Sequence, residues 1–276
     1  MKLFKSSGRV AVLIPLYKQS LSIAEEYSLA NTIRVLGNHD LYIIGPERLK
    51  EHFLSTYKKA EFDFRIALYP DKFFSSIKGY NKLLMSNFFY KSFSDYEYIL
   101  ILQTDALVFS DVLDSWCDRS YSYVGAPWFV GIEQPERPLS FLGVGNGGLS
   151  LRKVEDYIRV LSSPRYMPNF LPDNKKQPIS IKLFRWFIHH FIYAYNFYPF
   201  FPKRNEDFFW GLFVPRYCSF FTVPSAEDAV SFSFEAEPSY LYKLNQNQLP
   251  FGCHAWEKYD VDFWRQVLSE RGMQLP

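Results

Sequence analysis

The sequence YILILQTD at residues 98–105 consists of five apolar residues that run directly into three polar ones. An apolar run of this length is typical of a β-strand covered on both faces, as the strands of parallel sheets are. Ligands of such sheets bind beyond the carboxyl ends of the strands. Asp105 is therefore a candidate ligand for a divalent cation, an ion that prefers oxygen ligands and often bridges substrate phosphates. By its position alone, Asp105 could as well be an aspartate of a surface turn.

Strand signals alternate with helix signals upstream of this run. Residues 10–16, 41–44 and 62–68 are predicted to form strands. This order predicts an α/β fold with an open, Rossmann-like and mostly parallel sheet, right-handed crossovers and flanking helices. Tyr17 and Asp105 would then lie at the same edge of the sheet.

Local signals also mark the helices of this region. Ser22 is the predicted N-cap of the first helix, with Glu25 in the capping-box position and Gly37 at the end. Pro46 opens a second helix, where its missing N–H is not needed, and residues 80–93 are predicted to form a third.

The second half of the chain is less regular. Strands are predicted at residues 219–223 and 229–234, and a final amphipathic helix at residues 262–271. Residues 164–178 form a polar connector that contains several prolines. No shift in composition marks a second domain, so a single domain over residues 1–276 is expected.

Composition and charge exclude several classes of protein. The 31 basic and 29 acidic residues give a net charge of +2 without a basic block, which argues against a nucleic-acid partner. The aromatic content of 20% suits a carbohydrate enzyme, although most Phe side chains are expected in the core. The three cysteines are far apart in the sequence, which favours a reducing, cytoplasmic location over a disulfide framework.

Two further positions carry candidate chemistry. Glu206 and Asp207 are adjacent carboxylates beside aromatic residues, which suits a general base with a raised pKa but also the acidic first turn of a helix capped by Asn205. His254 stands between small and aromatic residues and could bind metal through a neutral imidazole or be structural. Residues 143–148 match G-x-G-x-x-G, but the motif does not follow a first strand, which disfavours a dinucleotide site and a dehydrogenase.

Six short segments follow one another in a specific order. They are YNKLL at 80–84, ILQTD at 101–105, YVGAPW at 123–128, GNGGLSLR at 145–152, NED at 205–207 and PFGCH at 250–254. Together they resemble a GT-A-like family of surface-polysaccharide glycosyltransferases that is largely catalogued as a domain of unknown function. The match spans about residues 10–256.

The resemblance implies a metal-dependent glycosyltransferase that moves a sugar from a nucleotide-sugar donor to a saccharide or lipid-linked saccharide acceptor. Asp105 would match the second carboxylate of the family's Asp-x-Asp motif and would hold Mn²⁺ or Mg²⁺ together with His254. Gln103 replaces the first carboxylate of that motif, which removes one charge from the metal site. Asp207, in the Glu206–Asp207 pair, would be the base of an inverting reaction.

The resemblance also assigns residues that bind the donor. Gly147 and Gly148 match the loop below the donor sugar, and Lys82 could reach a phosphate. Pro15 and Tyr17 stand where the nucleotide base and ribose usually lie. Residues 1–128 would hold the nucleotide and residues 129–276 the acceptor.

The segment from Ile179 to Tyr198 is apolar except for one polar stripe. Such a helix could lie in the interface of a membrane, at its inner face, close to a lipid-linked acceptor. The alternative is a buried core helix.

Two other functions remain open. A degenerate saccharide-binding module of the same fold is favoured by Gln103. A nucleotidyltransferase shares the metal chemistry, but it usually has a basic, glycine-containing loop after its first strand, and residues 16–19 do not provide one.

Overall fold

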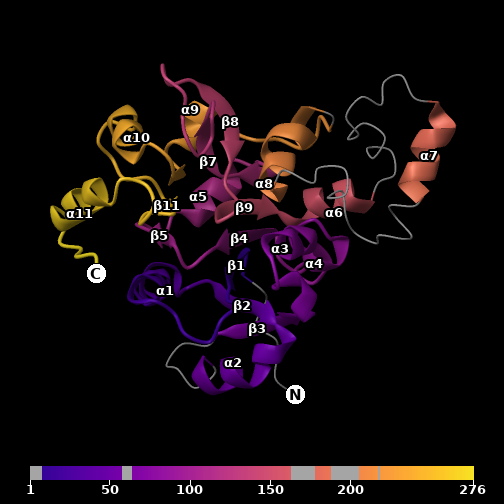
Figure 1. The fold of residues 1–276 in the computed structure, drawn as a ribbon, viewed down its shortest axis with the longest axis horizontal. Helices are drawn as coiled ribbons and strands as arrows, with labels where there is room; N and C mark the ends of the chain where they lie inside the picture. Colours follow the sequence, from indigo (N-terminus) through magenta and orange to yellow (C-terminus); the bar gives the residue numbers. More distant parts are fainter. Residues whose placement is uncertain (1–7, 58–63, 163–177, 188–204, 217) are drawn as a thin grey trace.

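A six-stranded sheet forms the centre of the computed structural model, which describes residues 8–57, 64–162, 178–187, 205–216 and 218–276 (Figure 1). The strand order is β3-β2-β1-β4-β9-β6. The strands are β1 Val10–Pro15, β2 Asp40–Pro46, β3 Arg65–Tyr69, β4 Tyr98–Leu102, β6 Tyr123–Val124 and β9 Leu149–Lys153. The first four strands are parallel, and β9 is antiparallel to both β4 and β6. The mostly parallel α/β sheet predicted from the sequence is therefore confirmed.

Both faces of the sheet are covered, as the continuous apolar runs predicted. Ala11 and Leu13 of β1 belong to one core cluster, which also contains residues of α3 Ile77–Leu84, α4 Asn87–Lys91 and α6 Val154–Ser162. Val10, Val12 and Ile14 belong to a second cluster with residues of α1 Ile23–Leu36, α2 Lys50–Thr56 and α5 Leu113–Asp118. Alternate side chains of one strand thus enter two different hydrophobic layers.

The predicted start of α1 is confirmed in detail. Ser22 Oγ accepts a hydrogen bond from Glu25 N at 3.2 Å, and Ser22 N donates to the Glu25 carboxylate at 2.8 Å. This reciprocal capping box satisfies two N–H groups that the helix leaves free.

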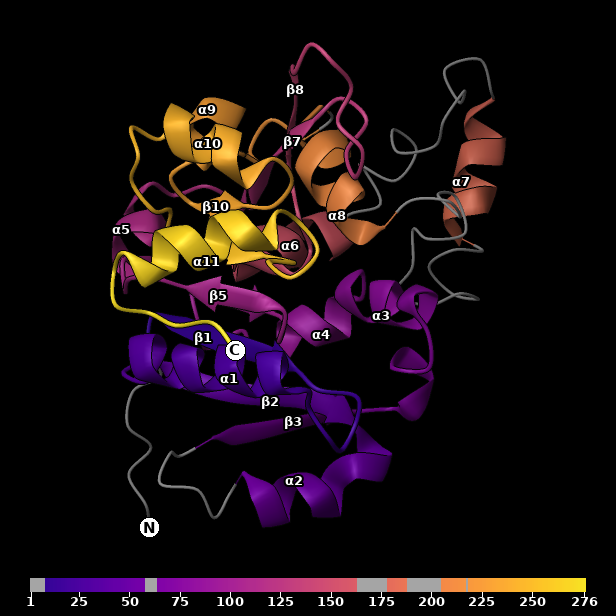
Figure 2. The same cartoon turned by 60° about the vertical axis from the view of Figure 1, so that its left-hand side comes forward.

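A smaller three-stranded sheet lies beside the main one (Figure 2). Its order is β10-β11-β5, with β10 Ser233–Phe234, β11 Gly252–His254 and β5 Ala106–Val108. β11 is antiparallel to β5, and His254 is paired with Ala106. Because Ala106 follows Asp105 directly, this register brings His254 next to Asp105. The hairpin of β7 Ala126–Phe129 and β8 Phe141–Gly145 and the helices α9 Ala226–Ala229, α10 Pro238–Leu244 and α11 Val261–Ser269 complete this region.

Three predicted elements differ from the structure. Residues 80–93 are split between α3 and α4, because the buried hydroxyl of Ser86 donates to the carbonyl oxygen of Leu83 at 2.6 Å and the chain begins a new helix after Ser86. Residues 219–223 form a turn and an irregular segment rather than a strand. In residues 229–234 only β10 is a strand, since α9 extends to Ala229; Ser225 is the N-cap of this helix and accepts a hydrogen bond from Asp228 N.

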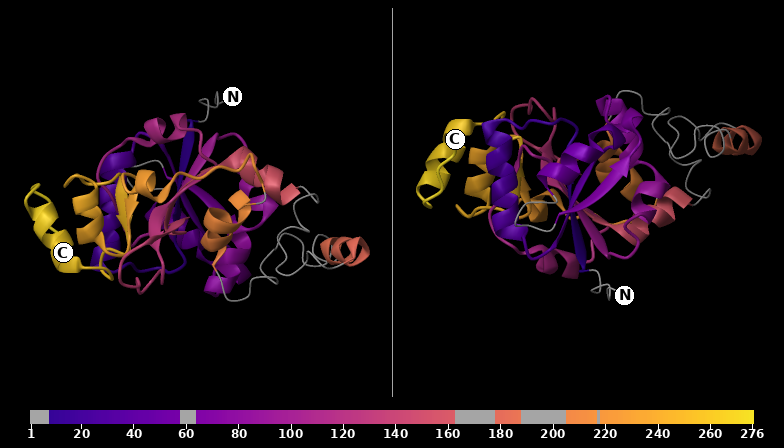
Figure 3. Two further views of the ribbon diagram at one scale, coloured as in Figure 1. Left: turned by 90° about the horizontal axis from the view of Figure 1, so that it is seen from above. Right: turned by 90° about the horizontal axis from the view of Figure 1, so that it is seen from below.

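The described part of the predicted helix 179–198 is α7 Ile179–Phe187. It lies apart from the central layers in each view, including both views of Figure 3. Its side chains Ile179, Ile181, Leu183 and Phe184 are exposed. Residues 188–198 and the predicted connector at 164–177 lie outside the described residues. Within the described part of the chain, no helix has the length and apolar character needed to cross a membrane.

Candidate active site

Asp105 and His254 meet where the two sheets adjoin. His254 Nε2 lies 3.3 Å from Asp105 Oδ1. Although burial acts in the opposite direction, the interaction with His254 lowers the pKa of Asp105 below its usual value. The two residues that the sequence singled out as metal ligands are thus brought together.

A second carboxylate, Glu235, completes the surroundings of His254. Its Oε1 accepts a hydrogen bond from His254 Nδ1 at 2.9 Å, and its Oε2 accepts one from Trp128 Nε1 at 3.0 Å. Burial alone would lower the pKa of His254, but Asp105 and Glu235 raise it to about 10. Sequence reasoning missed Glu235. The available signal was its position directly after a strand, which it shares with the polar residues that follow β4.

Residues 143–145 of the predicted glycine turn belong to β8, and the turn at residues 146–148 connects this pair to the second carboxylate site. A Cβ atom at Gly148 would collide with the imidazole of His254, so only glycine leaves room for the ring. The carbonyl oxygen of Gly148 accepts a hydrogen bond from Gln103 N at 2.8 Å, which continues the pairing of β4 with β9. Asn146, at φ 86°, holds the turn by accepting a hydrogen bond from Gly148 N at 2.9 Å. The motif thus serves close packing around His254.

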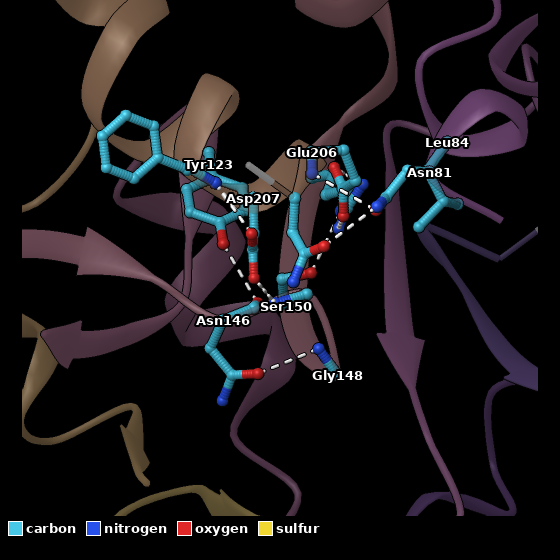
Figure 4. A network of polar contacts seen from close by, with 12 residues as sticks. Asn81, Leu84, Tyr123, Asn146, Gly148, Ser150, Glu206 and Asp207 are labelled. Carbon is cyan, nitrogen blue, oxygen red and sulfur yellow. Dashed lines mark hydrogen bonds and ion pairs between the residues drawn. The ribbon is translucent and has the colours of Figure 1, made fainter. Parts of the chain in front are cut away.

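Asp207 lies beside the same turn, close to Asn146 (Figure 4). It belongs to the short helix α8 Glu206–Phe208. Its Oδ2 accepts a hydrogen bond from Gly147 N at 2.9 Å, and its Oδ1 accepts one from Phe208 N at 2.8 Å. Burial, followed by the nearby carboxylates Glu206 and Glu235, raises the pKa of Asp207 to about 7. The side chain is half-buried and retains access to solvent. A carboxylate with this pKa can take up a proton near neutral pH.

Glu206 has a different environment from its neighbour. Both of its oxygens are bound by the fully buried guanidinium of Arg152, at 2.7 and 3.0 Å. Its backbone N–H donates to Asn81 Oδ1 of α3 at 3.2 Å, as Figure 4 shows. Glu206 therefore anchors the start of α8, and Asp207 is the carboxylate left for chemistry.

The residues assigned to the donor have varied surroundings. Pro15 is buried at the end of β1, whereas Tyr17 beyond it is 56% exposed. The carbonyl oxygen of Tyr17 accepts a hydrogen bond from Arg48, a further cation that the sequence analysis did not single out. Gln103 follows β4 directly, and its backbone N–H donates to the carbonyl oxygen of Gly148. Lys82 is partly buried on α3, and its amine forms no ion pair with any residue that the structure describes.

Asp105 and His254 offer a carboxylate oxygen and an imidazole nitrogen to a divalent metal. No group of three or more His, Cys, Asp or Glu residues within the described ranges is arranged as a metal site. However, the buried Nε2 of His254 makes no aligned hydrogen bond in the same part of the chain, and it faces a carboxylate. Divalent metals at phosphate sites are often held by only one or two protein side chains plus phosphate and water. The two residues therefore fit a metal whose remaining ligands come from the substrate.

Comparison with known proteins identifies a family without an assigned function. The model of the family described as "Protein of unknown function (DUF5672)" matches residues 63–254, well over half of the chain. No curated protein sequence matches the chain.

Solved glycosyltransferase structures share the fold. An active-site mutant of LgtC matches with a TM-score of 0.51 and 11% identity, over 94% of this chain and 95% of that one. The galactosyltransferase LgtC with donor and acceptor sugar analogs matches with a TM-score of 0.49 and 10% identity, over 94% and 95% of the two chains. Mouse xyloside xylosyltransferase 1 matches with a TM-score of 0.47 and 11% identity, over 88% and 96%. The first of these similarities, the one with a TM-score above 0.5, shows the GT-A glycosyltransferase fold.

Proposed function

Because this chain belongs to the DUF5672 family and has the GT-A fold, we propose that it is a metal-dependent glycosyltransferase. It would move a sugar from a nucleotide-sugar donor to a saccharide or lipid-linked saccharide acceptor in the synthesis of surface polysaccharide. The observation that carries this proposal is the convergence of Asp105, His254 and Asp207 on one glycine turn. Such a transfer requires a metal site and a general base. Asp105 and His254 suit the metal, and Asp207 suits the base.

Asp105 and His254 would hold Mn²⁺ or Mg²⁺ together with the diphosphate of the donor. When bound, such an ion offsets the negative charge that develops on the departing nucleoside diphosphate. His254 would act as a neutral ligand, so its Nε2 must first lose the proton that Asp105 and Glu235 stabilise. Gln103 stands after β4 at the position where a second carboxylate would add negative charge to the metal site. Asp105 would therefore be the carboxylate of this segment that binds the metal.

Asp207 would remove the proton from the attacking hydroxyl of the acceptor. The hydroxyl oxygen bonds to the anomeric carbon, the bond from that carbon to the diphosphate breaks, and the electron pair leaves with the diphosphate. The N–H groups of Gly147 and Phe208 fix the direction of the carboxylate during this transfer. Direct attack of this kind inverts the anomeric configuration.

The nucleotide would lie at the carboxyl ends of β1 and β4. The exposed ring of Tyr17 beside Pro15 can stack on the base, and Lys82 can approach a phosphate. Gly147 and Gly148 would lie below the donor sugar.

Thermal-shift measurements with a panel of nucleotide-sugars, with and without Mn²⁺, test the proposal. We expect at least one donor to raise the melting temperature more strongly with Mn²⁺. Asp105→Ala and His254→Ala should each remove the metal-dependent part of this shift, and Asp207→Asn should retain it while losing transfer. If no nucleotide-sugar changes the melting temperature with or without metal, the proposal is wrong.

The single carboxylate after β4 favours one alternative, a saccharide-binding module without catalysis. Such a module would bind saccharide but would not hydrolyse nucleotide-sugar at any metal concentration. Slow metal-dependent hydrolysis of the donor in the absence of acceptor would separate the two functions in favour of the enzyme.

We also propose that α7 contacts a membrane at its inner, cytoplasmic face. The exposed side chains Ile179, Leu183 and Phe184 support this, since an apolar helix surface binds the boundary between headgroups and acyl chains. We expect the protein to float with anionic liposomes and the triple variant Ile179→Ser/Leu183→Ser/Phe184→Ser to remain at the bottom of the gradient. Ile23→Ser, which removes an equally exposed apolar side chain from α1, is the control. Equal flotation of the triple variant and the control would contradict the proposal.

A further inference from the structure

We propose that Glu235 is a positioning residue that holds the imidazole of His254 with its Nε2 facing Asp105, and that Trp128 holds Glu235 in place. This inference rests on the proposed function and deepens it, because it assigns roles to two residues that are not themselves metal ligands. The small sheet brings Asp105, His254 and Glu235 together.

Three strands supply the three side chains. Asp105 precedes β5, His254 ends the central strand β11, and Glu235 follows β10. Phe234 is paired with Cys253, and His254 is paired with Ala106. The register therefore places His254 level with Glu235 on one side and one position from Asp105 on the other.

The contacts of Glu235 use both of its oxygens. Oε1 lies 2.9 Å from His254 Nδ1, and Oε2 accepts the indole N–H of Trp128 at 3.0 Å. The side chains of Glu235 and His254 are 15% and 14% exposed, so solvent competes little with this interaction. Hydrogen bonds to charged groups in such surroundings are stronger and more specific in direction than exposed ones.

An imidazole ring can rotate and exchange the positions of its two nitrogens. A carboxylate only accepts hydrogen bonds when ionised, so Glu235 requires a proton on Nδ1. Nε2 is then the nitrogen that faces Asp105, 3.3 Å from its Oδ1. A carboxylate behind a histidine orients metal-binding imidazoles in this way in many proteins. Gly148 leaves space for the ring, since a side chain there would occupy the position of the ring.

Trp128 provides a rigid anchor for Glu235. It lies on β7, is 6% exposed, and packs its indole against Gly145, where a Cβ atom would collide with the ring. The direction of the indole N–H is therefore set by a different sheet from the one that carries Glu235. Two independent elements thus fix the carboxylate.

Binding of Mn²⁺ to the full chain, measured by electron paramagnetic resonance, tests the proposal. Glu235→Ala removes the acceptor for Nδ1–H and should weaken Mn²⁺ binding by about 10–100-fold. Glu235→Gln keeps an acceptor for the same proton and should restore most of the affinity. Trp128→Phe keeps the packing but removes the indole donor, and it should give an intermediate loss. Glu227→Ala, which removes an exposed carboxylate from α9, should bind like the wild type.

A second measurement does not depend on the metal. Nitrogen-15 NMR of the His254 ring should show a protected Nδ1–H in the wild type and in Glu235→Gln, and an exchanging one in Glu235→Ala. If the wild type shows this proton but does not bind Mn²⁺, the proposed metal dependence fails while the positioning role stands. If Glu235→Ala binds Mn²⁺ like the wild type and keeps the Nδ1–H signal, the positioning role is overturned.

Discussion

Two adjacent carboxylates, Glu206 and Asp207, differ in their surroundings although they share the same sequence context. Arg152 binds both oxygens of Glu206, whereas Asp207, within the described ranges, accepts hydrogen bonds only from the N–H groups of Gly147 and Phe208. Burial and the neighbouring negative charges therefore act on Asp207 without a compensating cation among the described residues. Burial and nearby negative charge make the ionised form of a carboxylate less favourable, and the raised pKa that results makes Asp207 suitable as a base.

The pH dependence of transfer follows from this environment. Asp207 must be ionised to accept a proton, and its pKa is raised to about 7, so activity at saturating Mn²⁺, which keeps His254 deprotonated, should rise as the pH increases through about 7 and level off above it. Asp207→Asn should lower turnover by about 10²–10⁴-fold and leave donor affinity nearly unchanged. The measurement is the pH profile of kcat/KM for transfer. A limb near pH 4 in the wild type, or wild-type turnover in the variant, would show that the base lies elsewhere.

At the scale of elements, a buried ion pair joins β9 to α8. Arg152 on β9 is fully buried and also bonds Tyr90 and Ser150, each at 3.0 Å. Asn81 of α3 holds the same helix start through the backbone N–H of Glu206. The segment that carries Asp207 is therefore held from two directions, which limits the movement of the carboxylate proposed as the base.

Substitution of Arg152 should show how much its ion pair with Glu206 contributes to the free energy of unfolding. Arg152→Met leaves the buried Glu206 carboxylate without a partner and should lower the free energy of unfolding by about 3–5 kcal/mol. The double variant Arg152→Met/Glu206→Met should recover much of the loss, because no unpaired charge remains. Urea denaturation followed by tryptophan fluorescence measures both effects.

Lys258 provides the matched control for this experiment. Its ion pair with Glu133 is exposed on both sides, so Lys258→Met should change the free energy of unfolding by only about 0–1 kcal/mol. Equal effects of Arg152→Met and Lys258→Met would contradict the structural role of the buried pair.

At the scale of the whole molecule, the main sheet unites distant parts of the chain. β9 lies between β4 and β6, so residues 149–153 share a sheet with residues 98–102. The glycine turn immediately before β9 enters the site for this reason. The small sheet then brings residues 233–234 and 252–254 to the same place. The site is thus formed at the junction of two sheets.

Much of the architecture could be predicted from local sequence. The apolar runs at residues 10–16 and 98–102 and the capping box at Ser22 and Glu25 are signals within a few residues, and each corresponds to the observed element. The strand predicted at residues 219–223 is absent, and only part of the strand predicted at residues 229–234 forms. Short apolar segments have similar sequences in strands, turns and helix ends. The strand order and the antiparallel β9 carry no local signal.

The sequence by itself determined which side chains are candidates: Asp105, Asp207 and His254. Only the tertiary structure decided their partners, which stand far away along the chain. Glu235 is 19 positions from His254, and Arg152 is 54 positions from Glu206. Helix and strand signals arise among near neighbours in sequence, whereas the pKa of a buried group depends on burial and on charges within a few ångströms in space. The identity of a residue can therefore be read from the chain, but its protonation and its role follow from the fold.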